Sequence, residues 1–489
     1  MNLARASFGL SLLTSVFLGG CGSDAPTFAA PDRVAGVRAP QTASCGDSGE
    51  LRCLLPWPSN SFATADASTA TGLRLAVDPS SLLVDDDPRS YALADGFSRL
   101  TPVLVGFATE IDPNSIGTPE NGPISLILAQ KDHPNHGEKV PVRIRLVPGE
   151  DPTTETLVVA YPLRPLEPGA DYVAVVTNDL KAMDGKALSA TRDTQIALAT
   201  VEPASQDEAN LRGYHAPTRQ VVKEAGIDAA KVLRVFDFTT RSADDGIHWL
   251  AELRDASIAA VDKGDVQVVI DKVEPAPIAA LAVAVEGRLT GLPAFFEPDG
   301  DLSLGPDGKI LQTGTREAPF RAIVPTGQGD YRFVLYGHGT GGDYTDDSFD
   351  ELLGENGIGK IAIRFDGWTN NELIQTFSTL ARMAEATHRA STRTMHAVAA
   401  AAAIQHSMGS KLGDVLSAAK LGNTDNPAAG RRPDASIPMW TGGSLGGTMG
   451  LLFVSMYPGM KYGVVNVPGA AWTHFIPGSQ TYSTIRGLL

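Results

Sequence analysis

The spacing of apolar and polar positions changes twice along the chain. Between 45 and 200, short apolar runs alternate with turn residues such as Pro, Gly, Asn and Asp. Short β-type runs at regular spacing predict an all-β sandwich. The runs that define this region are 102–107, 124–128, 142–146, 157–161 and 172–176.

The region 201–320 has a mixed period. From Val221 to Ile258 apolar residues recur at helical spacing, which predicts two or three helices, interrupted by an extended segment at 235–240. From 266 to 324 short strands return, with Asp-Gly pairs as turn signals. We therefore expect this region to connect two larger domains.

In the last region, 321–489, apolar strands alternate with helices. A long Ala-rich helical stretch is expected at 371–408, and strands at 333–336, 361–365 and 462–467. Strands that are apolar throughout and separated by helices predict a parallel sheet covered on both faces. The predicted fold class is thus multidomain, with an N-terminal all-β sandwich, a connector and a C-terminal α/β domain.

The stretch 437–457 carries the strongest candidate chemistry. It predicts a buried strand, a tight turn Gly442-Gly443-Ser444-Leu445-Gly446 and an apolar helix that ends before Pro458. This is a G-x-S-x-G sequence in the strand–turn–helix setting of a nucleophile elbow. Glycines two positions either side of the serine suit such a bend, because side chains there would collide across it. A Gly-rich turn with a surface serine is the alternative, since the chain has 50 glycines.

A second element lies about a hundred residues upstream. An apolar strand at 331–336 opens into His338-Gly339-Thr340-Gly341-Gly342. With both elements the chain resembles α/β-hydrolases, in which a loop of this kind supplies half of the oxyanion hole. The closest likeness is to surface-anchored bacterial lipases and esterases with a β-rich N-terminal half. The patterns at 112–116 and 163–186 resemble bacterial Ig-like domains.

The resemblance implies a carboxylic-ester hydrolase. Ser444 would attack the ester carbonyl, and the amides of Leu445 and of Gly339 or Thr340 would bind the oxyanion. His338 would shape the oxyanion loop, and the elbow glycines Gly442, Gly443 and Gly446 would hold the bend.

In α/β-hydrolases the nucleophile belongs to a catalytic triad in the chain order Ser, then Asp or Glu, then His. This triad cannot be completed in that order here. The 45 residues after Ser444 (489 − 444) contain no Asp or Glu and one histidine, His474. One interpretation is that the hydrolase domain is truncated, and another is a rearranged triad of Ser444, His474 and Asp366. A non-catalytic cell-surface binding protein with a degenerate hydrolase domain is the alternative function, and a peptidase using the same elbow is a third.

The N-terminus predicts export. Residues 1–21 have an early Arg5 and a short apolar run that ends at Leu18-Gly-Gly-Cys21, which resembles the lipobox of bacterial lipoproteins. That resemblance implies acylation of Cys21 and an outer-membrane or cell-surface location in a Gram-negative bacterium. An ordinary cleaved signal peptide is the alternative. Residues 22–44 are small, polar and Pro-containing, as in a flexible tether.

Charge and cysteine content limit the partners. A net charge of −16 disfavours nucleic acid or an anionic membrane surface as the main partner. The membrane contact expected is the lipid anchor, and the substrate expected is a small or lipid ester. Cys45 and Cys53 predict a disulfide in an exported protein, with free or metal-binding thiols as the poorer alternative. No P-loop and no convincing metal-ligand cluster occurs in the sequence, so we expect no cofactor.

Overall fold

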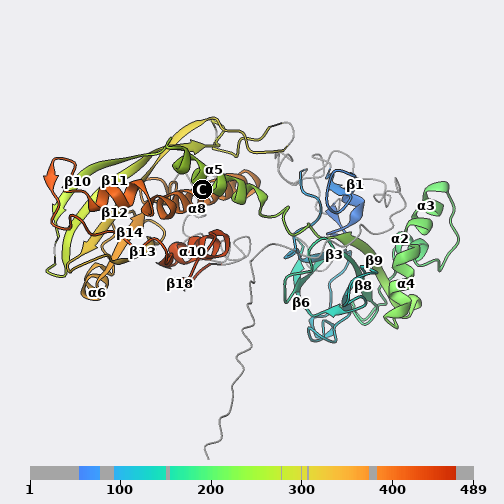
Figure 1. Ribbon diagram of the computed structural model, residues 1–489. Coiled ribbons are helices and arrows are strands. Elements are labelled where there is room, and N and C mark those ends of the chain that lie inside the picture. Colours follow the sequence, from blue (N-terminus) through green and yellow to red (C-terminus); the bar gives the residue numbers. More distant parts are fainter. Residues whose placement is uncertain are drawn as a thin grey trace, which may run out of the picture.

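The structure is a computed structural model that describes residues 54–77, 93–149, 155–276, 278–298, 300–305, 308–373 and 383–469. The signal peptide, the tether, Cys21, Cys45, Cys53 and His474 lie outside the described residues. In the part that is described, two large hydrophobic cores form, one in the N-terminal β region and one around a seven-stranded sheet. Figure 1 shows the strands of these two regions as separate groups.

The N-terminal body contains two antiparallel sheets. One has the order β3-β7-β6 and the other β5-β4-β8-β9. Alternate residues of β3, namely Val103, Val105 and Phe107, are buried in the same core as Tyr172 and Ala174 of β8. Side chains from two sheets that share one core make a β-sandwich, as predicted. That the sandwich is Ig-like stays a prediction. The strands are β3 (Val103–Phe107), β4 (Ile124–Leu128), β5 (Lys139–Val140), β6 (Val142–Pro148), β7 (Thr156–Pro162), β8 (Asp171–Thr177) and β9 (Val232–Thr239), beside a small hairpin of β1 (Ala63–Ala65) and β2 (Leu73–Leu75).

The sandwich extends beyond the expected end at residue 200. Strand β9, which contains the extended segment predicted within the connector, pairs along its length with β8. Helices α2 (Arg192–Ala197), α3 (Gln206–Tyr214) and α4 (Ala216–Glu224) precede it, and side chains of α2 and α4 pack against β8 and β9 in a core of their own. The expected boundary was wrong because strand pairing joins residues far apart in sequence.

The second body is built on a seven-stranded sheet in the order β10-β11-β12-β14-β13-β17-β18. The pairs from β10 to β14 are antiparallel, and β14, β13, β17 and β18 are mutually parallel. The strands are β10 (Gln267–Pro275), β11 (Leu281–Ala294), β12 (Gly314–Pro325), β13 (Arg332–Gly337), β14 (Ile358–Ile363), β17 (Met439–Gly443) and β18 (Tyr462–Asn466).

This topology corrects two expectations. The sheet is mixed, not parallel throughout, and it begins at Gln267 inside the expected connector. The boundary expected at 321 falls within β12, which pairs with β11 on one side and with β14 on the other. The α/β character of the C-terminal body is as predicted.

Helices cover both faces of this sheet. Side chains of α5 (His248–Lys263), α8 (Met383–Met408) and α9 (Lys411–Ser417) share a core with Val283 and Val285 of β11. Ala284, which points to the opposite face, packs in a different cluster, near α6 (Asp350–Glu355). Helix α10 (Leu445–Met456) packs against β17 and β18. No helix in the described ranges is long and apolar enough to cross a bilayer.

Candidate active site

The elbow predicted from the sequence is present. Strand β17 ends at Gly443, helix α10 begins at Leu445, and Ser444 between them has φ 55° and ψ −117°. A positive φ of this kind is strained for a residue with a side chain, and such strain concentrates at functional sites. The serine side chain is exposed, while Leu445 and Gly446 beneath it are buried. The turn therefore presents a hydroxyl at the carboxyl end of a central strand.

Close backbone approach explains two glycines of the elbow. A methyl group on Gly446 would overlap the backbone carbonyl of Gly337 at the end of β13. A methyl group on Gly442 would lie 2.6 Å from the carbonyl oxygen of Gly446, closer than real contacts allow. Larger residues at either position would push α10 away from the sheet.

The His-Gly loop lies beside the elbow because β13 and β17 are parallel neighbours, with Gly337 opposite Gly442. A methyl group on Gly339 would lie 4.0 Å from Ser444 Cβ. Among the described residues, no backbone carbonyl accepts from the amides of Gly339 or Thr340. The amide of Leu445 is in the first turn of α10, where no intrahelical acceptor exists. The structure thus places the start of the His-Gly loop and the first turn of α10 beside Ser444.

His338 is buried and both ring nitrogens are engaged. Its Nε2 accepts from the amide of Phe365 at 3.1 Å, so Nδ1 carries the proton and donates to Gly339 O at 2.7 Å. Burial lowers the pKa of His338, which favours this neutral form. The ring joins the loop to the end of β14, so His338 supports the loop and does not serve as the base.

Asp366 follows β14 but faces arginines. Its carboxylate lies 3.3 Å from Arg364 Nε and 3.9 Å from Arg316 Nη1. Partial burial raises the pKa of Asp366, and the two guanidinium groups oppose that shift. The structure therefore pairs Asp366 with cations, which does not support its expected role as the orienting acid of a triad.

Two supporting residues were missed in the sequence. The carbonyl of Asn466 in β18 accepts from the amide of Ser444 at 3.1 Å. Glu372 Oε2 accepts from the amide of Gly367 at 2.7 Å and from Thr369 Oγ1 at 2.9 Å. This turn holds Trp368, whose carbonyl accepts from Gly341 N at 2.9 Å. The signal was available, because Thr369 and Glu372 have the S/T-x-x-E spacing of a capping box.

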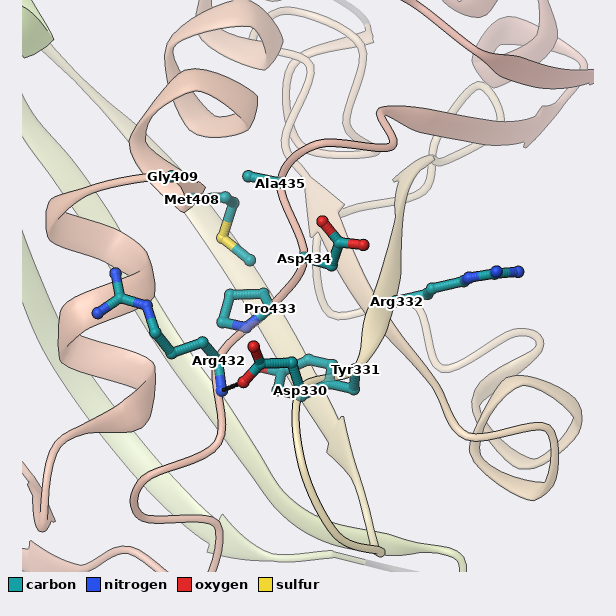
Figure 2. A pocket seen from close by; sticks show the side chains of 9 residues that line it. All are labelled: Asp330, Tyr331, Arg332, Met408, Gly409, Arg432, Pro433, Asp434 and Ala435. Atoms are coloured by element: carbon teal, nitrogen blue, oxygen red, sulfur yellow. Dashed lines mark hydrogen bonds between the residues drawn. The ribbon is translucent and has the colours of Figure 1, made fainter.

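A cavity of about 440 Å³ lies at the amino end of β13, away from the elbow. Figure 2 shows the residues that line it. Its lining includes Arg332, the first residue of β13, and Asp330, which accepts from the amide of Arg432 at 3.0 Å. Strands rise about 3.3 Å per residue, so Arg332 is roughly 20 Å from His338, where the His-Gly loop begins. The cavity is therefore separate from the elbow. Within the described ranges, no group of three or more His, Cys, Asp or Glu is placed to hold a metal ion.

No protein-family model and no curated protein matches the sequence. Solved structures with similar architecture include acetyl xylan esterase 1 from Thermoanaerobacterium sp. JW/SL YS485, with a TM-score of 0.28 and 14% identity over 49% of this chain and 65% of that chain. An acetyl xylan esterase from Paenibacillus sp. R4 has a TM-score of 0.27 and 12% identity over 50% of this chain and 67% of that one. A glucuronoyl esterase from Teredinibacter turnerae T7901 has a TM-score of 0.25 and 12% identity over 42% and 46%. The chain thus spans just under two thirds of the first of these enzymes.

Proposed function

We propose that this chain is an α/β-hydrolase that cleaves carboxylic esters with Ser444 as nucleophile. The observation that carries the proposal is the strained φ of 55° at Ser444, at a strand-to-helix turn with the His-Gly loop alongside. A fold has no stability reason to keep a non-glycine residue in this conformation, whereas a nucleophile gains exposure and a fixed direction from it.

In this mechanism Ser444 Oγ attacks the ester carbonyl carbon and passes its proton to a base. The carbonyl oxygen becomes an oxyanion that accepts hydrogen bonds from the amides of Leu445 and of Gly339 or Thr340. Each such donor can be worth about 3 kcal/mol of barrier. Collapse of the tetrahedral species expels the alcohol, which takes the proton from the base, and water then releases the acid from Ser444.

The base of this mechanism is neither His338 nor Asp366. His338 is excluded by its two ring hydrogen bonds, and Asp366 faces Arg316 and Arg364. His474, after the elbow, is our candidate for the base and lies outside the described residues. We assign no orienting acid.

The second candidate is a non-catalytic cell-surface binding protein. The engagement of His338 and the arginine partners of Asp366 favour it, because neither residue can complete a triad as placed. In this case the elbow would be a remnant without turnover.

A fluorophosphonate probe separates the two functions. It reacts covalently with activated serines, so the hydrolase proposal expects its mass to appear on the peptide that contains Ser444, together with turnover of p-nitrophenyl acetate and butyrate. Both signals should disappear in Ser444→Ala. A chain that neither reacts nor turns over ester, while its circular dichroism is that of a folded protein, would instead support the binding protein.

We also propose that the enzyme is exported and anchored to the outer membrane through a lipid on Cys21, with the sandwich as an Ig-like spacer. Two acyl chains are needed for stable anchoring, which a lipoprotein modification supplies. Growth with radiolabelled palmitate should label the wild-type chain and not Cys21→Ala. Equal labelling of both would contradict the anchor.

A further inference from the structure

Strand β14 carries a lysine that the mechanism above does not use. Lys360 lies between Gly359 and Ile361, and its side chain is 0% exposed. Lysine is almost never fully buried unless its charge is paired, because its ammonium group loses its hydration. A lysine in the middle of a central strand therefore needs a specific set of partners.

Those partners lie between residue 346 and the first residue of α6, in the segment that follows the His-Gly loop. Lys360 Nζ donates to Asp346 O at 2.9 Å and to Ser348 O at 2.8 Å, and it forms an ion pair with the carboxylate of Asp350. The ammonium group, which has three donors, is thus surrounded by two hydrogen-bond acceptors and one carboxylate. The ammonium also lies 4.8 Å from the centre of the Tyr336 ring, in a cation–π contact.

The network ties this loop to three strands. Arg321 of β12 donates to Asp350 Oδ2 at 2.7 Å, and Tyr336 of β13 donates to Asp346 Oδ2 at 2.8 Å. Upstream, the loop is held by His338, whose Nε2 accepts from the amide of Phe365, and by the bond from Gly341 N to Trp368 O. The segment 338–350 is therefore fixed at its first residues by one side-chain and one backbone hydrogen bond to the 365–369 turn, and at its last residues by Lys360.

We infer that Lys360 is a positioning residue: by holding 346–350 on the sheet it keeps the loop that carries the amides of Gly339 and Thr340 in place beside Ser444. The inference rests on the proposed ester hydrolysis and deepens it. Lys360 touches no reacting atom, and its effect on the rate passes through the loop. Backbone donors stabilise an oxyanion only when their direction is fixed before the reaction.

Charge balance makes Lys360→Met a usable test. Methionine has a similar length to lysine and no charge. Without the Lys360 cation, the negative charge of Asp350 is still balanced by the positive charge of Arg321. The variant should therefore fold. The matched control is Leu289→Ala, which removes a fully buried side chain of β11 in the main core and leaves the loop contacts intact.

Hydrogen exchange and kinetics together test the inference in the full chain, under conditions where both variants stay folded. We expect the protected amides of Gly341, Gly342 and Asp350 to exchange at least 10-fold faster in Lys360→Met and at the wild-type rate in Leu289→Ala. Turnover of p-nitrophenyl acetate should show kcat reduced 10- to 100-fold in Lys360→Met, with KM within about 3-fold of wild type. Leu289→Ala should keep both constants.

The outcomes distinguish this inference from the proposed function. Unchanged exchange in Lys360→Met overturns the anchoring, and faster exchange with unchanged kcat overturns the positioning. If the wild-type chain turns over no ester, the proposed function fails. The exchange difference would then still decide whether Lys360 anchors the loop.

Discussion

The two segments that meet at the candidate site are fixed by different physical means. The elbow, 442–446, is held by backbone sterics: its glycines allow α10 to touch the end of β13, and its serine takes a strained φ. The His-Gly loop, 338–350, is held by side chains that bond to its backbone, notably His338 and Lys360. One segment depends on the absence of side chains and the other on their presence.

This difference has consequences for robustness. A steric constraint does not titrate and responds only to added volume, whereas a polar constraint responds to pH and to the loss of single hydrogen bonds. Ser444 should therefore keep its place under conditions in which the amides of Gly339 and Thr340 lose theirs.

Replacing Ser444 should separate the effect of backbone strain on stability from the effect of the hydroxyl on ester turnover. Ser444→Gly should reduce ester turnover by at least about 1,000-fold, because the attacking oxygen is gone. It should also raise the free energy of unfolding by about 1 kcal/mol, since glycine adopts φ 55° without strain. Urea unfolding and p-nitrophenyl acetate turnover measure the two effects. The control is Ser455→Ala, at an exposed serine of α10. It should change ester turnover and unfolding free energy only slightly. Turnover preserved in Ser444→Gly would refute the nucleophile.

Adding volume should break the elbow. In Gly446→Ala the new methyl group overlaps the carbonyl of Gly337, so we expect a loss of about 3 kcal/mol or more in unfolding free energy. Denaturant titration gives this value. Gly213→Ala is the matched control, because a methyl group there meets no atom within 4 Å in helix α3. That variant should be more stable by up to about 1 kcal/mol. Similar behaviour of the two variants would show that the elbow is not sterically constrained.

The loop should respond to pH where the elbow does not. Burial lowers the pKa of His338 from 6.5, so below that pH the unfolded chain binds a proton that the folded ring refuses. Stability should therefore fall as pH falls, and His338 should account for up to about 1 kcal/mol of the loss between pH 7.5 and 5.5. His338→Gln should flatten the curve of unfolding free energy against pH by that amount. Phe365→Leu removes the ring that packs on His338, with the two ring centroids 4.7 Å apart, but removes no titrating group and should keep the wild-type slope. Parallel curves for His338→Gln and wild type would show that His338 does not cause the dependence of unfolding free energy on pH.

The same contrast explains how much the sequence could predict. The elbow was predictable because its constraint is local: the glycines and the serine lie within five residues. The anchoring of the loop was not, since Lys360 interrupts an apolar run and the strand was expected to begin only after it, at Ile361. A lysine in that position predicts a surface residue, and only the fold brings Asp346, Ser348 and Asp350 around it. Likewise β10 and β11 could not be assigned to the sheet, because their pairing depends on contacts absent from the local pattern.

Tyr336 makes one hydrogen bond to the loop, and the nearby Tyr331 offers a control for its loss. Tyr336 donates to Asp346 Oδ2 at 2.8 Å, and burial raises the pKa of Tyr336 to about 12, so the hydroxyl stays protonated at neutral pH. Tyr336→Phe should cost about 1 kcal/mol in unfolding free energy, because it leaves a partly buried carboxylate without this donor. Tyr331, the residue before the same strand, is also buried, but in the described part of the chain its hydroxyl has no hydrogen-bond partner. Tyr331→Phe should therefore be neutral or slightly stabilising, since it removes a buried polar group that gains nothing from the fold. Equal losses in the two variants would mean that the effect comes from packing of the ring and not from the bond that holds the loop.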